Sequence, residues 1–185
     1  MVIQERRPGD RLSIPQPEGE EMNAFTSLSE KVSKSYEGDS EPRLYMIGRW
    51  HNSLGWLGAH ILGLEETNDI VAVENVEIEM AHQLRGMAIG AAILLRSLGV
   101  VDPAEEFNAE YLRAVVKHPG MTLDSDTHSD ESRYYALAEE VGEVCAALTY
   151  DNKAATGHNS DLISEVTQVG ALAIAWLIRF DEEES

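Results

Sequence analysis

Apolar residues recur at intervals of three and four along four segments of the chain, and this spacing constrains the fold more than any other feature. An α-helix turns once in about 3.6 residues, so such intervals place apolar side chains on one helical face. The four stripes are Leu54, Leu57, Ile61 and Leu64; Met80, Leu84, Met87, Ala91, Leu94 and Leu98; Leu137, Val141, Val144 and Leu148; and Leu162, Val166, Val169, Ala173, Trp176 and Phe180. The pattern predicts an all-α bundle with four core helices.

Residues 1–42 differ from the rest of the chain in composition. Prolines at positions 8, 15, 17 and 42 stand among many Gly, Ser and Glu residues. A segment of this kind is expected to bury little apolar area, so it predicts a flexible N-terminal arm. Within it, only "NAFTSLSEKVSKSY" has the character of a short helix.

The remaining residues, 43–185, predict one all-α domain made of two helical hairpins and a connecting helix. Gly99 marks the end of the first hairpin, and Pro119 with Gly120 ends the connecting helix. The expected N-caps of the last two core helices are Ser129 or Asp130, and Asn159 or Ser160. The expected units are a hairpin over 44–99, a connecting helix over 104–118 and a hairpin over 129–180.

The two hairpins resemble each other. "GWLGAHILGL" (55–64) aligns with "EEVGEVCAAL" (139–148), which matches Gly58 to Gly142 and places Arg49 opposite Arg133. The second and fourth stripes also have the same steps. An internal duplication explains these matches, but any two amphipathic hairpins with short loops also look alike.

Charge and cysteine content restrict the classes of function. The formal net charge of −19 argues against binding to polymeric nucleic acid or to anionic membranes, both of which require clustered Lys and Arg. An anionic substrate would need metal cations to bridge it to such a protein. The single Cys145 excludes an intrachain disulfide and suits a reducing cytoplasm. We expect no run to reach the roughly 18 apolar residues of a membrane span, and "MVIQERRPGDR" is too polar for a secretory signal. We therefore expect a cytoplasmic protein.

Two pairs of polar residues have the spacing expected of a metal site. Glu140 and Glu143 are three residues apart, and each precedes a core position of the third stripe. Glu165 and Gln168 have the same spacing and the same phase relative to the fourth stripe. If the helices pack as an antiparallel hairpin, the two pairs converge at the edge of the core. Carboxylate and amide oxygens suit Mg²⁺ or Mn²⁺. Taken alone, Glu140 and Glu143 are more typical of a solvated helix flank, and it is Glu165 at the matching phase that favours the metal site.

"EEVGEV" followed by "ISEVTQVGALAIAWL" resembles the MazG-like members of the all-α nucleoside triphosphate pyrophosphohydrolase superfamily, which includes the dimeric dUTPases. The resemblance covers about residues 129–180. It implies a four-helix core, often completed by dimerisation, and Mg²⁺-dependent hydrolysis of a nucleoside triphosphate to monophosphate and pyrophosphate. It assigns Glu140, Glu143 and Glu165 as catalytic metal ligands, because they match the family's E-x-x-E and the first acid of its E-x-x-D.

The chain departs from the family pattern at Gln168, which stands where the motif has Asp. Gln168 then supports the metal without contributing a charge. In an alternative alignment to the E-x-x-D motif, Glu165 takes the position of the last acid and Leu162 that of the first. Asp161 is then a nearby substitute for the first acid. The N-terminal hairpin lacks the motif acids. The residues opposite them are Trp56 and Ala59, with His82 and Arg85 or Gln83 and Gly86.

Other polar residues give weaker indications. Lys153 and His158 lie in the loop between the acidic helices, within reach of a substrate phosphate, although both are also typical surface residues. "TLDSDTHSDES" lacks the glycine and closing glutamate of a calcium loop and predicts a solvated turn. We expect a homodimer, or a monomer in which the N-terminal hairpin takes the place of a second copy. A silent helical module that binds nucleotide or a protein partner is the competing hypothesis.

Overall fold

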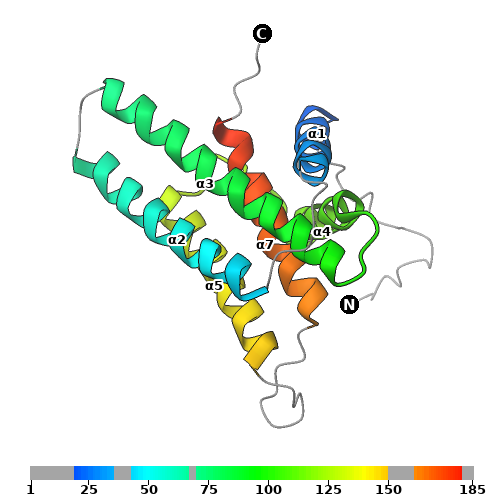
Figure 1. Ribbon diagram of the computed structural model, residues 1–185. Coiled ribbons are helices and arrows are strands. Elements are labelled where there is room, and N and C mark those ends of the chain that lie inside the picture. Colours follow the sequence, from blue (N-terminus) through cyan, green and yellow to red (C-terminus); the bar gives the residue numbers. More distant parts are fainter. Residues whose placement is uncertain (1–18, 36–42, 67–69, 150–160, 181–185) are drawn as a thin grey trace, which may run out of the picture.

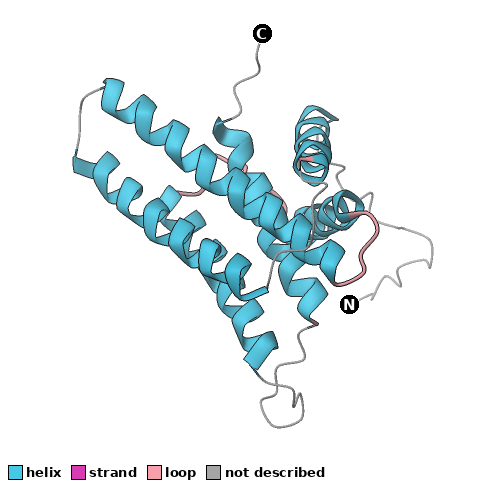
Figure 2. Cartoon of the chain, in the orientation of Figure 1, coloured by secondary structure: helices cyan, strands magenta, loops and turns pink. Residues whose placement is uncertain are grey.

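The computed structural model describes residues 19–35, 43–66, 70–149 and 161–180, and this part of the chain is helical without any strand (Figure 2). The all-α prediction is therefore confirmed. The helices are α1 (Gly19–Lys34), α2 (Arg43–Glu66), α3 (Ile70–Ser97), α4 (Pro103–Lys117), α5 (Asp130–Thr149) and α7 (Leu162–Leu177), followed by the short 3₁₀ helix η1 (Ile178–Phe180).

Four of these helices pack in a closed ring (Figure 1). Helix α2 packs against α3, α3 against α7, α7 against α5, and α5 against α2. Most of the predicted stripe residues fill the centre of this ring, with Leu57, Leu84, Leu137 and Val166 almost completely buried, whereas Leu148 at the end of the third stripe is exposed. The stripes therefore specify four helices that share one core, as expected from their period.

Helices α3 and α7 approach closely because small residues line the surface where they meet. Ala88, Ala91 and Ala92 on α3 and Gly170 and Ala173 on α7 are buried. A Cβ atom on Gly170 would lie 2.2 Å from Cε1 of Phe107 on α4 and 3.0 Å from Cβ of Ala91. Gly170 therefore allows α3, α4 and α7 to meet at one point.

Helix α1 packs on α4 and α3, which corrects the expectation of a flexible arm over residues 1–42. Phe25, Leu28 and Val32 are buried, and the Phe25 ring stacks on Tyr111 of α4 with 4.1 Å between the ring centroids. The short helix expected over 23–36 is confirmed and begins earlier, at Gly19. Its three apolar residues recur at intervals of three and four, a stripe too short to stand out among the polar residues. The rest of the expected arm lies outside the described residues.

The helix ends follow local sequence in most places. Gly99 adopts a φ of 94° just after α3, as its position predicts, and Gly120 a φ of 69° after α4. Ser129 caps α5 by accepting a hydrogen bond from the Ser132 backbone at 3.2 Å. The N-cap of α7 is Asp161 rather than Asn159 or Ser160. Its carboxylate accepts a hydrogen bond from the Ile163 backbone, as a capping Asp does.

The two hairpins are α2 with α3 and α5 with α7. Each packs its first helix on the first helix of the other and its second on the second, as two duplicated hairpins would. Arg49 and Arg133, which align in sequence, lie in different environments. Arg49 is exposed beside Tyr45, whereas Arg133 is buried. The duplication stays a prediction.

Leu162–Phe180 is long and apolar enough to cross a membrane, with a mean hydropathy of 1.4. The expectation that no stretch reaches this length and composition is therefore wrong. The position of the stretch accounts for its composition, because 61% of it is buried against other parts of the fold. A helix that is apolar on nearly all sides is what the centre of a helical protein requires.

We predict opposite effects of alanine at two helical glycines. Gly170→Ala should lower the free energy of unfolding by about 2 kcal/mol, because its methyl group overlaps the buried Phe107 ring. Gly142→Ala on α5 is the matched control. It has nothing within 4 Å of its added Cβ and should raise stability by about 0.5 to 1 kcal/mol through helix propensity. Urea unfolding followed by circular dichroism measures both, and equal effects would contradict the packing described for Gly170.

We also predict that docking of α1 contributes to stability. Phe25→Ala should lower the free energy of unfolding by about 3 kcal/mol, because it removes a fully buried ring stacked on Tyr111. Asn23→Ala changes an exposed residue of the same helix and should have little effect. A Phe25→Ala protein as stable as the Asn23→Ala control would show that α1 is not docked in solution.

Candidate metal centre

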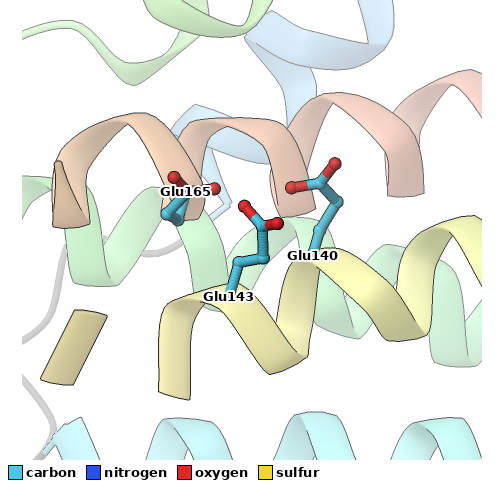
Figure 3. A group of neighbouring side chains, drawn as sticks. All are labelled: Glu140, Glu143 and Glu165. Atoms are coloured by element: carbon cyan, nitrogen blue, oxygen red, sulfur yellow. The ribbon is translucent and has the colours of Figure 1, made fainter. Parts of the chain in front are cut away.

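Three carboxylates meet between α5 and α7. Glu140 and Glu143 come from α5 and Glu165 from α7, and their side chains point toward one another (Figure 3). One oxygen of each carboxylate lies within 4.8 Å of the others. Each glutamate directly precedes a buried valine, which turns it to the edge of the interface between the helices. The predicted convergence of these residues is confirmed.

Glu165 is the most deeply placed of the three, with only 4% of its surface exposed. Its Oε2 accepts a hydrogen bond of 3.0 Å from Nε2 of Gln168. Burial raises the pKa of Glu165 to about 7, and its hydrogen bond with Glu143 and the repulsion by Glu143 and Glu110 add to the shift. Arg113 opposes the shift by stabilising the carboxylate. Loss of hydration is therefore the main destabilising effect on the charged form.

Glu140 has a buried carboxylate oxygen, Oε2, with no hydrogen-bond partner among the described residues. Burial raises the pKa of this carboxyl to about 7, with further contributions from the charges of Glu143 and Glu165. A buried polar atom without a partner is unfavourable and is uncommon in folded proteins. A cation at this position would contact the unpaired Glu140 oxygen and would offset the repulsion between the carboxylates.

The donor set fits a hard divalent cation. All of the converging atoms are carboxylate oxygens, and they lie within 4.8 Å of one another. At such separations, small side-chain rotations would allow one Mg²⁺ ion to contact all three at its usual Mg–O distance of roughly 2.1 Å. Three such ligands leave coordination positions for water or phosphate oxygens, as is usual for Mg²⁺. The chemistry of the residues is therefore compatible with Mg²⁺ or Mn²⁺.

The remaining predicted site residues differ in their placement. Gln168 lies beside Glu165 but directs its amide nitrogen at that carboxylate, so its oxygen faces away from Glu165. Asp161, the substitute acid of the alternative alignment, is engaged as the N-cap of α7. The geometry thus favours the alignment in which Glu165 is the first acid of its pair. Lys153 and His158 lie outside the described residues.

A cavity of about 430 Å³ adjoins the carboxylate cluster at Glu140. Its walls come from α4, the segment 118–129, α5 and α7, and Glu140 and Gln168 line it beside the cluster. Apolar side chains such as Leu123, Ala171 and Leu172 line much of the rest. The cavity therefore combines an acidic edge with an apolar interior, which suits an organic ligand whose charged part binds at the carboxylates.

The segment 118–129 is a turn with many exposed residues, as predicted, and it also forms a wall of this cavity. Buried Arg133 donates hydrogen bonds to the carbonyls of Leu123 at 2.7 Å and Ser125 at 2.6 Å, and to the Asp130 carboxylate at 2.8 Å. Tyr111 donates to Asp124 at 2.6 Å. The acidic residues here serve as acceptors within the protein, which composition alone does not reveal.

Sequence reasoning missed two residues of α4, Glu110 and Arg113, which both line the cavity. The negative charge of Glu110 raises the pKa of Glu140 and Glu165, and Arg113 lowers that of Glu165, although burial dominates both shifts. The segment was interpreted only as a connecting helix. Its regular spacing of Glu110, Arg113 and Lys117 on one face was the available indication.

We predict that the metal-free protein loses stability as the pH rises. The folded pKa values of Glu140 and Glu165 lie near 7, above the ordinary value of 4.5. The contribution of these two carboxyl groups to the free energy of unfolding is therefore fully present below about pH 4.5 and is lost as the pH rises through 7. Between pH 5 and 8 the free energy of unfolding should fall by about 3 kcal/mol in EDTA.

The measurement is a series of urea unfolding curves in EDTA across this range. Glu140→Gln should flatten the dependence, because it removes one of the two titrating groups. Glu105→Gln, an exposed residue of α4, is the control and should leave the slope unchanged. A stability that increases steadily from pH 5 to 8 in the metal-free wild type would contradict the buried carboxylate cluster.

Comparison with family models, with curated proteins and with solved structures gave no match to this chain. The function must therefore be argued from the geometry of the carboxylates and the adjoining cavity, together with the resemblance of residues 129–180 to a known motif.

Proposed function

We propose that this protein is a MazG-like nucleoside triphosphate pyrophosphohydrolase that requires Mg²⁺ or Mn²⁺. The observation that carries the proposal is the meeting of Glu140, Glu143 and Glu165 within 4.8 Å at the edge of a 430 Å³ cavity. The cluster would bind a cation that contacts the phosphates, and the cavity would bind the nucleoside.

The packing of the helices supports the same proposal. The E-x-x-E pair lies on α5 and the second acidic position on α7, and these helices are neighbours in a ring of four. That arrangement is the one expected of a MazG-like four-helix bundle. One chain supplies all four helices of the ring, which favours the pseudo-dimeric monomer over a homodimer as the basic unit.

In the proposed reaction the chain binds and orients the substrate. Glu140, Glu143 and Glu165 hold the cation, and the cavity walls hold the nucleoside so that the bond between its α and β phosphates lies at the carboxylates. A cation bound there neutralises phosphate oxygens and lowers the pKa of a coordinated water. The apolar lining excludes bulk water from the nucleoside. Hydrolysis then yields a nucleoside monophosphate and pyrophosphate.

A silent module that binds nucleotide is the second candidate, and one observation favours it. Gln168 replaces the fourth acid of the motif, and its amide nitrogen donates to Glu165 at 3.0 Å. That hydrogen bond stabilises the carboxylate without the help of a cation and so competes with metal binding. The two candidates differ in whether pyrophosphate is released.

We predict that Glu143→Gln and Glu165→Gln each abolish Mg²⁺-dependent pyrophosphate release. Each change removes an anionic ligand from a site whose cation supplies most of the electrostatic stabilisation, so activity should fall at least about a hundredfold. Both metal-free variants should be as stable as the wild type or more stable, because repulsion between carboxylates is relieved. The measurement is a screen of ribo- and deoxyribonucleoside triphosphates for pyrophosphate, with thermal unfolding alongside.

Two further variants make the experiment decisive. Glu131→Gln changes an exposed glutamate of α5 outside the cavity lining, removes the same charge and should retain activity. Gln168→Asp restores the fourth acid and should tighten Mg²⁺ binding and raise turnover. If Gln168→Asp gains Mg²⁺ affinity while neither it nor the wild type hydrolyses any triphosphate, the silent module is correct. Full activity in both Glu143→Gln and Glu165→Gln would show that the metal centre lies elsewhere.

A further inference from the structure

Arg113 on α4 lines the cavity beside the acidic cluster. Its Nε and Nη2 donate to the two oxygens of Glu110 at 2.8 and 2.6 Å, so that one edge of the guanidinium is fixed. Its remaining nitrogen, Nη1, has no hydrogen-bond partner among the described residues. Since both residues line the cavity, an arginine with one edge held and the other edge available adjoins the carboxylates.

The charges around Arg113 favour a role in binding anions. Its strongest interaction is the hydrogen-bonded pair with Glu110, and the charges of Glu140 and Glu165 add to the increase in its pKa, so the guanidinium stays charged beside the cluster. Lys117 lines the same cavity. In a chain with a net charge of −19, Arg113 and Lys117 place two cationic side chains on the α4 wall of the cavity, beside Glu110.

We propose that Arg113 binds the pyrophosphate portion of the substrate, the part that leaves in the reaction. This inference rests on the proposed function. The guanidinium offers parallel N–H groups that match two phosphate oxygens, a geometry that a lysine ammonium does not reproduce. The carboxylates are on α5 and α7 and Arg113 is on α4, so the phosphates lie between a cation on one side and the guanidinium on the other.

Glu110 is a positioning residue in this arrangement. It holds the guanidinium by a bidentate pair and thereby restricts the rotation of a long side chain that is 55% exposed. Binding to a group that is already ordered loses less conformational entropy on association. Glu110 lies three residues before Arg113 on the same helix, which keeps the pair together without any other element.

The test is calorimetric titration of inorganic pyrophosphate into Mg²⁺-saturated protein. Arg113→Gln should weaken pyrophosphate binding about tenfold or more, since charge-assisted hydrogen bonds are lost. Arg113→Lys keeps the charge but loses the fork and should recover only part of the affinity. The matched control is Arg49→Gln, which changes an exposed arginine on α2, a helix that does not pack against α4. It should bind pyrophosphate as the wild type does.

A titration with Mg²⁺ alone separates this inference from the metal centre. Arg113→Gln should bind Mg²⁺ at least as tightly as the wild type, because a positive charge beside the carboxylates has been removed. Pyrophosphate affinity equal in Arg113→Gln and Arg49→Gln, or no pyrophosphate binding by the wild type, would overturn the inference. If binding depends on Arg113 but no triphosphate is hydrolysed, the inference stands and the proposed enzymatic function fails.

Discussion

The burial of α7 is the constraint on which the rest of the structure depends. This helix carries almost no charge between Leu162 and Leu177, and α3, α4, α5 and α1 all pack against it. Glu165 is the only charged residue of this helix and lies close to its N-terminus. Because the neighbouring helices must cover α7 from several sides, Glu165 is enclosed along with the apolar residues. The packing that stabilises the core thereby creates a buried carboxylate.

A single buried carboxylate would take up a proton, but here the neighbouring helices supply further charges. Glu140 and Glu143 on α5 and Glu110 on α4 add negative charge around Glu165, and Arg113 adds one positive charge. The cluster is unfavourable without a cation, since desolvation and repulsion act in the same direction. Helix stability alone gives no reason to place three glutamates at this position. The expected compensation is the binding of a cation.

Much of this arrangement could be predicted from local sequence, and the rest could not for definite physical reasons. The period of the apolar residues specified the ring helices, and the phase of Glu140, Glu143 and Glu165 relative to the valines specified their convergence. The docking of α1 was missed because it depends on Phe25 meeting Tyr111, two residues far apart in sequence. The contribution of α4 was missed for the same reason: amphipathic spacing shows which face of a helix is polar, but not which helix that face meets.

The need to cover α7 explains why a helix, α4, connects the two hairpins instead of a short loop. Two hairpins alone bury their apolar faces in the ring, but they leave α7 uncovered on the side away from α5 and α3. Helix α4 covers that side through Phe107 and Tyr111, and the face next to these residues carries Glu110 and Arg113. The segment 118–129 then crosses back to α5, anchored by Arg133. The connection between the hairpins thus completes the core, and the same helix brings the Glu110–Arg113 pair into the lining of the cavity.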